Sequence, residues 1–171
     1  MPKIIGINYA NEKYKKAQKL NSWSMLHKGK VDKVIEYSPL DLDEGFREKN
    51  SSILEATRGN GYWLWKPYII CKTLEKIEYG DYVFYCDSGA VILHNVRLLI
   101  NSLRKTKQDI MCFSLELVEK NYSKRDAFIL MDCDDKLFFS TFQRLATYII
   151  VKKTDESIKI LVLHGFMGNS I

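Results

Sequence analysis

Apolar and polar residues alternate along the chain in blocks whose spacing predicts strands and helices in turn. The first three expected elements are a strand, a helix and a strand, at residues 3–8, 12–27 and 31–37. One face of this helix carries Tyr14, Ala17, Leu20 and Trp23. A strand, a helix and a second strand in succession are typical of a parallel sheet.

The same pattern continues towards the end of the chain. Further strands are expected at residues 82–86, 109–114 and 147–151. Further helices are expected at residues 41–49, 51–58, 67–77, 95–105, 125–131 and 155–163, and polar loops at 116–124 and 132–135. We therefore expect a three-layer α/β/α sandwich around a central, mostly parallel sheet, formed by residues 1–171 as a single domain.

The most informative stretch begins with a glycine-hinged aromatic loop at residues 58–65, which contains Trp63 and Trp65. Lys66 and Pro67 follow, and proline is favoured at the first position of a helix because its missing N–H would have no partner there. Apolar residues then recur at helical spacing. The loop is therefore expected to lead into a helix that begins at Pro67.

This helix is followed by a strand that ends in a carboxylate. Residues 82–86 form a continuous apolar run, as expected of a strand that is covered on both faces. Asp87, Ser88 and Gly89 come directly after it. Ligands of open α/β sheets bind beyond the carboxyl ends of the strands, so Asp87 is a candidate for holding a metal ion or a sugar hydroxyl group.

Length and composition suit a globular domain with its own core. The chain has 171 residues, of which 46% are hydrophobic and 27% are charged. Its cysteines are Cys71, Cys86, Cys112 and Cys133. They form no C-x-x-C pair, so we expect buried free thiols rather than a zinc site. The first residues do not resemble a signal peptide, and no apolar run reaches the ~20 residues of a membrane span, which leads us to expect a cytoplasmic protein without a transmembrane segment.

The formal net charge of +5 is compatible with an anionic partner such as a nucleic acid, a membrane surface or a phosphorylated small molecule. The basic residues are spread over separate predicted helices, with Lys13, Lys15, Lys16 and Lys19 on one and Arg104, Lys105 and Lys107 at the end of another. Basic side chains near the C-terminus of a helix are favourable on their own account. We therefore interpret these residues as solvated helix faces and expect no nucleic-acid partner.

Several catalytic signatures are absent from the sequence. It contains no phosphate-binding P-loop, no dinucleotide-binding glycine fingerprint and no nucleophile elbow. The histidines, His27, His94 and His164, are far apart. A hydrolase built on histidine is therefore poorly supported.

A family resemblance emerges from the central stretch. It contains R-G-N-G-Y-W-L-W-K-P-Y-I-I and, further on, G-D-Y-V-F-Y-C-D-S-G. These segments resemble the W-x-W-K-P and D-[AS]-G motifs of a group of bacterial and viral glycosyltransferases with the nucleotide-diphospho-sugar transferase (GT-A) fold. The resemblance spans residues 3–160 and includes Glu116 and the segment Y-S-K-R-D at residues 122–126.

The resemblance implies an enzyme of polysaccharide biosynthesis that transfers a sugar from a nucleotide-diphosphate-sugar donor to a hydroxyl group of a glycan or lipid-linked acceptor. A divalent metal ion, Mn²⁺ or Mg²⁺, held by Asp87 would offset the charge on the leaving diphosphate. The implied donor-binding residues are Arg58, Trp63, Trp65, Lys66, Asp87, Ser88 and Gly89. The implied catalytic residues, which would position or deprotonate the acceptor hydroxyl, are Glu116, Lys124 and Asp126.

The chain departs from the family pattern in two ways. The commonest metal motif of this fold is D-x-D, and Gly89 stands in place of its second aspartate. Family members also carry a C-terminal H-x-D-Q-S-like segment that would supply a further metal ligand, and the sequence after His164 does not match it. We therefore expect that the C-terminal part of the family domain is missing, that donor binding persists and that transfer is weak.

The candidate residues also have simpler interpretations. One of the two tryptophans at positions i and i+2 is expected to belong to the core, and Arg58 can pair with Glu55. Glu116, Lys124 and Asp126 can form a surface salt-bridge cluster that contributes little. Two other functions remain open: a catalytically inactive binding protein on the same fold and, with less support, a nucleic-acid-binding module.

Overall fold

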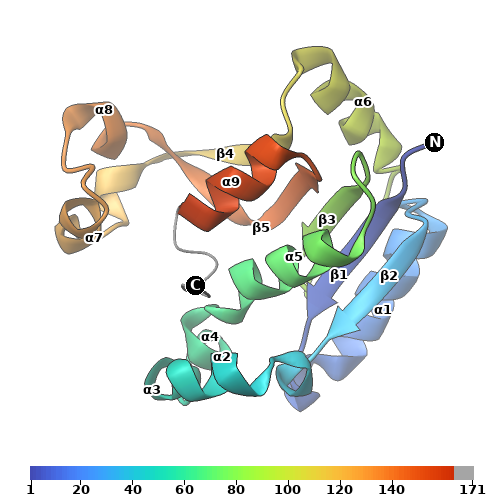
Figure 1. The fold of residues 1–171 in the computed structure, drawn as a ribbon, viewed down its shortest axis with the longest axis horizontal. Coiled ribbons are helices and arrows are strands. Elements are labelled where there is room, and N and C mark those ends of the chain that lie inside the picture. Colours follow the sequence, from blue (N-terminus) through green and yellow to red (C-terminus); the bar gives the residue numbers. More distant parts are fainter. Residues whose placement is uncertain (164–171) are drawn as a thin grey trace. The chain divides into compact units, whose positions relative to one another are not determined.

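The structure is a computed structural model that describes residues 1–163, so His164 lies outside the described residues. The described part contains a five-stranded sheet with the order β2-β1-β3-β5-β4 (Figure 1). The strands are β1 Ile4–Tyr9, β2 Lys33–Tyr37, β3 Tyr82–Cys86, β4 Ile110–Val118 and β5 Phe142–Lys152. The three strands predicted in the first half of the chain are confirmed, and they belong to one sheet.

The sheet is mixed rather than mostly parallel throughout. Strand β1 pairs in parallel with β2 on one side and with β3 on the other. Lys153, at the end of β5, exchanges backbone hydrogen bonds with Gly80 and Asp81 at the start of β3, so β5 and β3 run in opposite directions. The amide of Lys152 donates to the carbonyl of Asp109, which makes β4 and β5 antiparallel as well. The expected α/β class is confirmed, and the parallel part of the sheet is β2-β1-β3.

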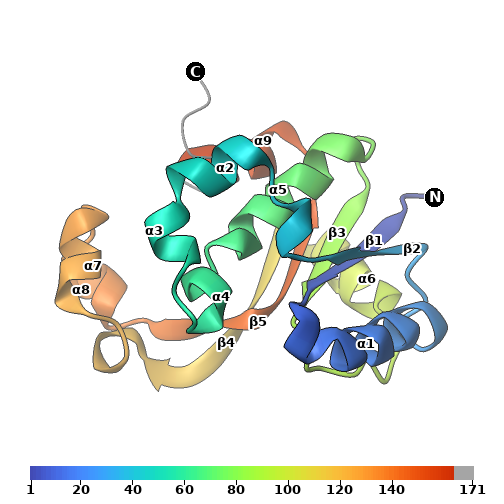
Figure 2. The same cartoon turned by 90° about the horizontal axis from the view of Figure 1, so that it is seen from below.

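Helices connect the strands and cover both faces of this parallel part. Their bounds are α1 Lys15–His27, α2 Glu44–Lys49, α3 Ser51–Leu54, α4 Gly59–Tyr62, α5 Trp65–Lys76, α6 Arg97–Thr106, α7 Arg125–Leu130, α8 Lys136–Phe139 and α9 Asp155–Leu163. Short 3₁₀ turns are η1 Glu12–Tyr14, η2 Pro39–Asp41 and η3 Glu119–Asn121. Helices α5 and α9 lie on one face of β1 and β3, and α1 and α6 lie on the other (Figure 2).

Several boundaries differ from those that the sequence predicts. Helix α5 begins at Trp65, so Pro67 is its third residue rather than its first. Glu116 lies inside β4 rather than in a polar loop. Ser114, Leu115 and Glu116 continue the alternation of exposed and half-buried side chains that a strand requires, which explains the longer strand. Helix α8 and the first half of β5 were not predicted.

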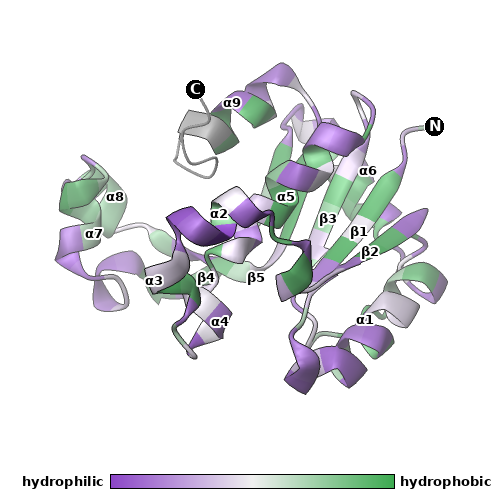
Figure 3. Ribbon diagram, turned by 60° about the horizontal axis from the view of Figure 1, so that its bottom comes forward, coloured by the Kyte–Doolittle hydropathy of each residue, from purple (hydrophilic) through white to green (hydrophobic). Residues whose placement is uncertain are grey.

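The centre of the sheet is apolar. Every residue of β1 and β3 is buried, and Figure 3 shows both strands as largely hydrophobic. The core residues packed around them include Ile5, Ile7, Ile69, Leu74, Val83, Tyr85, Val151 and Leu161. Burying one aliphatic side chain of this kind contributes about 1.5–3 kcal/mol. These contacts fix the carboxyl end of β3, and with it the position of the residue that follows.

Helix α1 packs on the sheet with a mostly polar face. Its buried residues are Gln18, Asn21, Ser22, Ser24 and Met25. The apolar face that the sequence predicts points instead to solvent, since Tyr14, Leu20 and Trp23 are 52%, 52% and 49% exposed. Helices of globular proteins usually bury their apolar face. In α1 most of the buried polar groups form hydrogen bonds to the ends of β1 and β3, such as that from Asn8 to Asn21, whereas Oε1 of Gln18 has no partner among the described residues.

The described chain divides into two compact units. Among the described residues the larger consists of residues 1–111 and 149–163, and the smaller of Cys112–Tyr148. No helix within residues 1–163 has the length and apolar character needed to cross a bilayer. In the larger unit Cys71 and Cys86 are buried free thiols, as expected, whereas Cys112 in the smaller unit is exposed on β4 and Cys133 is half-buried. The expectation of buried thiols is therefore wrong for Cys112.

Candidate functional site

Asp87 directly follows β3, the middle strand of the sheet, and so lies at its carboxyl end, as predicted. The side chain is 37% exposed. Its Oδ1 atom lies 3.0 Å from Nζ of Lys66 and also accepts a hydrogen bond from the hydroxyl of Tyr85. Its Oδ2 atom accepts no hydrogen bond from any residue of the described part. The described residues therefore hold one carboxylate oxygen of Asp87 by hydrogen bonds and leave the other without one.

Lys66 reaches Asp87 from the first turn of α5. Its side chain is only 14% exposed, and its ammonium lies 4.8 Å from the ring centre of Tyr85 and 5.9 Å from that of Trp65. An ammonium over an aromatic face is attracted to it, more strongly when water is excluded. The arrangement places a shielded positive charge beside Asp87, where it can bind an anionic group.

Tyr85 supplies the second partner of Asp87 from within β3. Burial, and then the neighbouring charge of Asp87, raise the pKa of the Tyr85 hydroxyl well above its ordinary value. The hydroxyl therefore remains protonated and acts as a donor to the carboxylate. Tyr85 and Lys66 together hold Oδ1 of Asp87.

The two tryptophans of the aromatic loop have different environments, as predicted from their spacing. Trp65 is 5% exposed, stacks on Tyr9 with ring centres 3.8 Å apart, and donates from Nε1 to the carbonyl of Gly59 at 3.0 Å. Trp63 is 45% exposed, and Tyr62 beside it is 59% exposed. Trp65 is thus a core residue. Trp63 and Tyr62 are the aromatic residues of this loop that are exposed to solvent.

A left-handed turn holds these two exposed aromatic residues. All of residues 59–63 have positive φ angles between 49° and 88°. The amide of Tyr62 donates to the carbonyl of Arg58 at 2.9 Å, and that of Trp63 to Gly59 at 3.2 Å, as in one turn of a left-handed helix. This conformation costs roughly 1–2 kcal/mol for each residue other than glycine. Strain of this kind is concentrated at functional sites in proteins, which marks the turn as a candidate binding element.

Ser88 and Gly89 complete the loop after Asp87. The hydroxyl of Ser88 donates to the carbonyl of Tyr9, which joins the ends of β1 and β3. The space where a Cβ of Gly89 would lie is open, with no atom within 4 Å. Ser88 therefore has a structural role, and Gly89 leaves the backbone accessible to a ligand.

Two residues that the sequence analysis did not single out position the same loop. Nδ2 of Asn21 in α1 donates to the carbonyls of Ala90 and Asp87, at 2.8 and 3.3 Å. Asn21 is itself bonded to Asn8, the penultimate residue of the apolar strand β1, at 2.6 Å. Both asparagines are fully buried. A polar residue at the end of an apolar strand was the available signal for Asn8, whereas nothing in the sequence pattern distinguished Asn21 from its neighbours.

Arg58 stands at the start of the left-handed turn and is exposed. Within the described residues its guanidinium makes no ion pair, so the alternative pairing with Glu55 is not observed. Its planar, fork-shaped group is suited to a phosphate or carboxylate. Arg58, before the left-handed turn, and Lys66, in the first turn of α5, are thus two nearby cations in the sequence, one exposed and one shielded.

The predicted catalytic residues belong to the smaller unit. Glu116 lies on β4, Lys124 immediately precedes α7, and Asp126 lies in the first turn of α7. All three are exposed, and no ion pair or hydrogen bond among residues 1–163 joins them, so the alternative of a salt-bridge cluster is not observed. This unit also contains a cavity of about 470 Å³ lined by Lys120, Ser123, Arg125, Phe128, Asp134 and Phe139.

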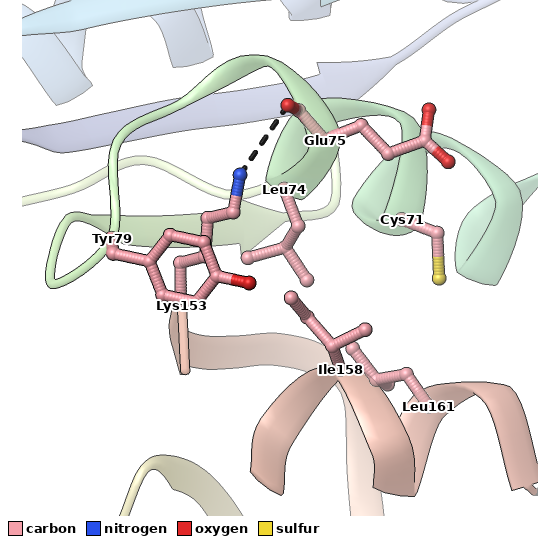
Figure 4. Close-up of a pocket in the computed structure, with 7 residues that line it drawn as sticks. All are labelled: Cys71, Leu74, Glu75, Tyr79, Lys153, Ile158 and Leu161. Atoms are coloured by element: carbon pink, nitrogen blue, oxygen red, sulfur yellow. Dashed lines mark hydrogen bonds between the residues drawn. The ribbon is translucent and has the colours of Figure 1, made fainter. Parts of the chain in front are cut away.

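A second cavity, of about 280 Å³, lies in the larger unit between α5 and α9 (Figure 4). It is lined mainly by apolar groups of Cys71, Leu74, Ile158 and Leu161. Lys153 lies at its edge and donates hydrogen bonds to the carbonyls of Glu75 and Ile77. These bonds hold its ammonium at the C-terminal end of α5. Lys153 pairs with the residue before β3, so this cavity lies at the opposite end of β3 from Asp87. It is separate from the predicted donor site.

The residues around Asp87 can be tested for a divalent metal. Within residues 1–163 no three His, Cys, Asp or Glu side chains come together. Mg²⁺ is commonly bound through one or two carboxylates, with substrate phosphates and water as the other ligands. Asp87, which is partly exposed and has one oxygen without a hydrogen bond in the described part, fits the role of the protein's contact to a metal held largely by a diphosphate.

No model of a known protein family matches the chain, and no curated protein matches it. The case for a function therefore rests on the motif resemblance and on the geometry around Asp87. In that geometry the central strand and the start of α5 meet at one carboxylate.

Proposed function

We propose that the chain is a metal-assisted glycosyltransferase that uses a nucleotide-diphosphate-sugar donor. The observation that carries the proposal is the grouping of Asp87, Lys66 and Tyr85 at the carboxyl end of the central strand. Helices on both faces of the parallel strands are what the three-layer GT-A arrangement requires, which supports the same proposal. A cytoplasmic location is part of the proposal.

The diphosphate of the donor would lie between Lys66 and the partly exposed carboxylate of Asp87. A divalent ion, Mn²⁺ or Mg²⁺, would supply Lewis-acid stabilisation of the charge that develops on the leaving diphosphate. Lys66 contributes a shielded positive charge from the protein itself. Arg58 adds a planar group that can bind two phosphate oxygens at once. These residues bind and orient the donor.

The exposed rings of Tyr62 and Trp63 would contact the sugar or the base. Aromatic faces bind the apolar face of a ring, and the tyrosine hydroxyl can also form a hydrogen bond. Because hydrogen bonds fix the backbone of the left-handed turn, the backbone would lose little conformational freedom on binding. Gly89 would let the sugar approach the backbone beyond Asp87.

Residues of the smaller unit would bind and activate the acceptor, which is a glycan or a lipid-linked hydroxyl compound. Glu116 and Asp126 are exposed carboxylates suited to accept a proton from the attacking hydroxyl, and Lys124 would orient it. A base must come within about 3 Å of the hydroxyl from which it takes a proton. This assignment depends on the resemblance of the segment at 122–126 to the glycosyltransferase motif.

The ion pair between Lys66 and Asp87 also favours a second candidate function. Lys66 already neutralises the carboxylate that a metal would use. A protein of the same fold could then bind a nucleotide-sugar through its cations alone and catalyse no transfer. Metal-independent binding without turnover is the property that separates this candidate from the enzyme.

The experiment combines calorimetry with a transfer assay. A panel of nucleotide-diphosphate-sugars is titrated into the protein with Mn²⁺ and with a chelator, and radiolabelled donors are then followed for release or transfer of the sugar. We expect manganese-dependent binding of one donor class and slow turnover. Binding of single-stranded RNA with no response to any nucleotide-sugar would overturn both candidates.

A further inference from the structure

The excess positive charge of the chain is not spread over the molecule. Residues 12–33 contain seven lysines and two carboxylates, a net charge of +5, which equals the net charge of the whole chain. The remaining residues contain equal numbers of basic and acidic side chains. The segment comprises η1, α1, the turn after α1 and the first residue of β2. The positive field of the molecule therefore originates at α1 and its two ends.

These lysines are exposed and largely unneutralised. Six of the seven are exposed, and Lys15 is half-buried. Within the described residues Lys19 is the member of the group that forms an ion pair, with Glu36 at 2.7 Å. Of the two carboxylates, Asp32 is already paired with Arg97 on α6. The charge is thus available to an external partner.

Apolar side chains are interleaved with these lysines on the outer face of α1. Lys16, Leu20, Trp23 and His27 follow one another at helical spacing along a single stripe. Leu20 and Trp23 are about half exposed, and Leu26 beside them is 40% exposed. Since the buried face of α1 is polar, the helix presents its apolar side chains outward. Much of the α1 ribbon is hydrophilic in Figure 3, with apolar positions between the polar ones.

The loop after Asp87 extends this surface. The amide of Ile92 donates to Ser24, and the carbonyl of Gly29 accepts from Val96, so the loop runs alongside α1. Within it Val91 and Leu93 are 47% and 71% exposed. Exposed apolar side chains next to a concentrated basic patch distinguish this region from an ordinary solvated helix face.

We infer that the outer face of α1, together with the loop at 90–96, binds the surface of an anionic phospholipid membrane. Helices that lie in the membrane interface combine lysines on a polar face with Trp and Leu side chains that enter the boundary of the acyl chains. Lysine stems bury their methylene groups while the ammonium contacts the headgroups. A nucleic-acid partner would use the lysines but gain little from Leu20, Leu26 and Leu93.

The inference is independent of the transfer activity, but it places the candidate site close to the bilayer. Asn21, on the buried face of α1, holds the backbone of Asp87 and Ala90. The helix that contacts the membrane would therefore also position the loop that carries the carboxylate. This arrangement suits an acceptor whose reactive hydroxyl is linked to a lipid.

The test is co-sedimentation of the whole chain with vesicles of phosphatidylcholine containing phosphatidylserine, compared with vesicles of phosphatidylcholine alone. We expect binding to the anionic vesicles that weakens as salt is added. Each lysine close to such a surface contributes about 1 kcal/mol, so the triple variant Lys13→Gln, Lys16→Gln, Lys28→Gln should bind about a hundredfold more weakly. Trp23→Ala should bind about tenfold more weakly.

A matched triple variant, Lys49→Gln, Lys76→Gln, Lys105→Gln, removes the same charge from exposed positions on α2, α5 and α6. It should retain most of the vesicle binding. Circular dichroism melting curves verify that all variants fold. Equal losses in the two triple variants, or equal binding to neutral and anionic vesicles, would overturn the inference. Binding to single-stranded RNA but not to vesicles would also overturn it and assign the patch to nucleic acid.

Discussion

The ammonium of Lys66 lies 3.0 Å from Oδ1 of Asp87, and this pair connects the first turn of α5 to the end of β3. Lys66 is largely shielded from water, whereas Asp87 is partly exposed. Removing one member of a shielded pair leaves the other charge poorly compensated. The pair is therefore a structural contact in the free protein as well as the proposed donor site.

Replacement of Lys66 by Met should reduce both stability and donor binding. We expect the free energy of unfolding to fall by about 1–2 kcal/mol, because Asp87 loses its cation. Donor affinity should fall about tenfold or more, since a charge-assisted contact to the diphosphate is lost. Urea unfolding and calorimetry measure the two effects. Lys76→Met, an exposed position at the end of the same helix, serves as the control and should change neither quantity.

A double-mutant cycle with Asp87→Asn isolates the pair. If the contact is energetically significant, the double variant should be more stable than the sum of the two single losses predicts. Additive losses would mean that Lys66 and Asp87 stabilise the protein independently and that the observed pair is only a surface contact.

The left-handed turn should be intolerant of side chains at its glycines. A Cβ at Gly61 would lie 2.8 Å from Cα of Leu54, and one at Gly59 would lie 2.5 Å from the ring of Trp63. Both residues also have positive φ angles. We expect Gly61→Ala to destabilise the protein by about 1–3 kcal/mol.

The matched control for this prediction is Gly45→Ala in α2. No atom lies within 4 Å of a Cβ added there, so alanine should be neutral or stabilise the helix by about 0.5–1 kcal/mol. Thermal unfolding compares the two variants. A Gly61→Ala variant as stable as the Gly45→Ala variant would show that the turn is not held in the left-handed conformation.

Buried cysteines should make the protein less stable in alkali. Burial raises the pKa of the Cys86 thiol from 9.0 to about 11. Between these values the unfolded chain releases the thiol proton and the folded protein keeps it, so stability falls as the pH rises through this window. The loss attributable to Cys86 should reach about 3 kcal/mol.

Urea unfolding at several pH values across this window checks the prediction. Cys86→Ala should flatten the decline, whereas Cys133→Ala, at a half-buried position, should leave its slope unchanged. Identical slopes for the wild type and Cys86→Ala would mean that the thiol is not protected from solvent in the folded protein.

The sequence was informative where one physical effect dominated. Residues 82–86 are continuously apolar, and that alone predicted a buried strand with Asp87 at its end. The spacing of Trp63 and Trp65 predicted that only one would be buried, and the structure confirms it. Helix α9 begins and ends at the predicted residues.

The sequence was less informative where long-range contacts override local pattern. Phe142 and Arg144 are both exposed in β5, so the first half of that strand lacks a clear alternation of polar and apolar residues. In α1 the apolar stripe predicts the wrong buried face, because Asn21 and Gln18 find hydrogen-bond partners at the strand ends. The pairing of Lys66 with Asp87 depends on how α5 approaches β3, which spacing along the chain does not encode.

The assignment of Glu116 and Asp126 as acceptor-side residues predicts an effect on turnover rather than on donor binding. Glu116→Gln and Asp126→Asn should each lower the rate of sugar transfer by about 100-fold or more if the residue acts as the base. The donor dissociation constant should stay the same, because the proposed donor-binding residues lie in the larger unit. Single-turnover transfer and calorimetry distinguish the two quantities, and a variant that loses donor affinity alone would contradict the assignment.

The most direct test of the proposed function is the effect of Asp87→Asn on manganese-dependent donor binding. The substitution keeps the size of the side chain and removes the charge that would hold the metal. Calorimetry with Mn²⁺ and the nucleotide-sugar that binds the wild type should show a loss of about 100-fold or more in affinity, while circular dichroism shows an unchanged fold. A variant that bound donor and Mn²⁺ as tightly as the wild type would contradict the central role of Asp87.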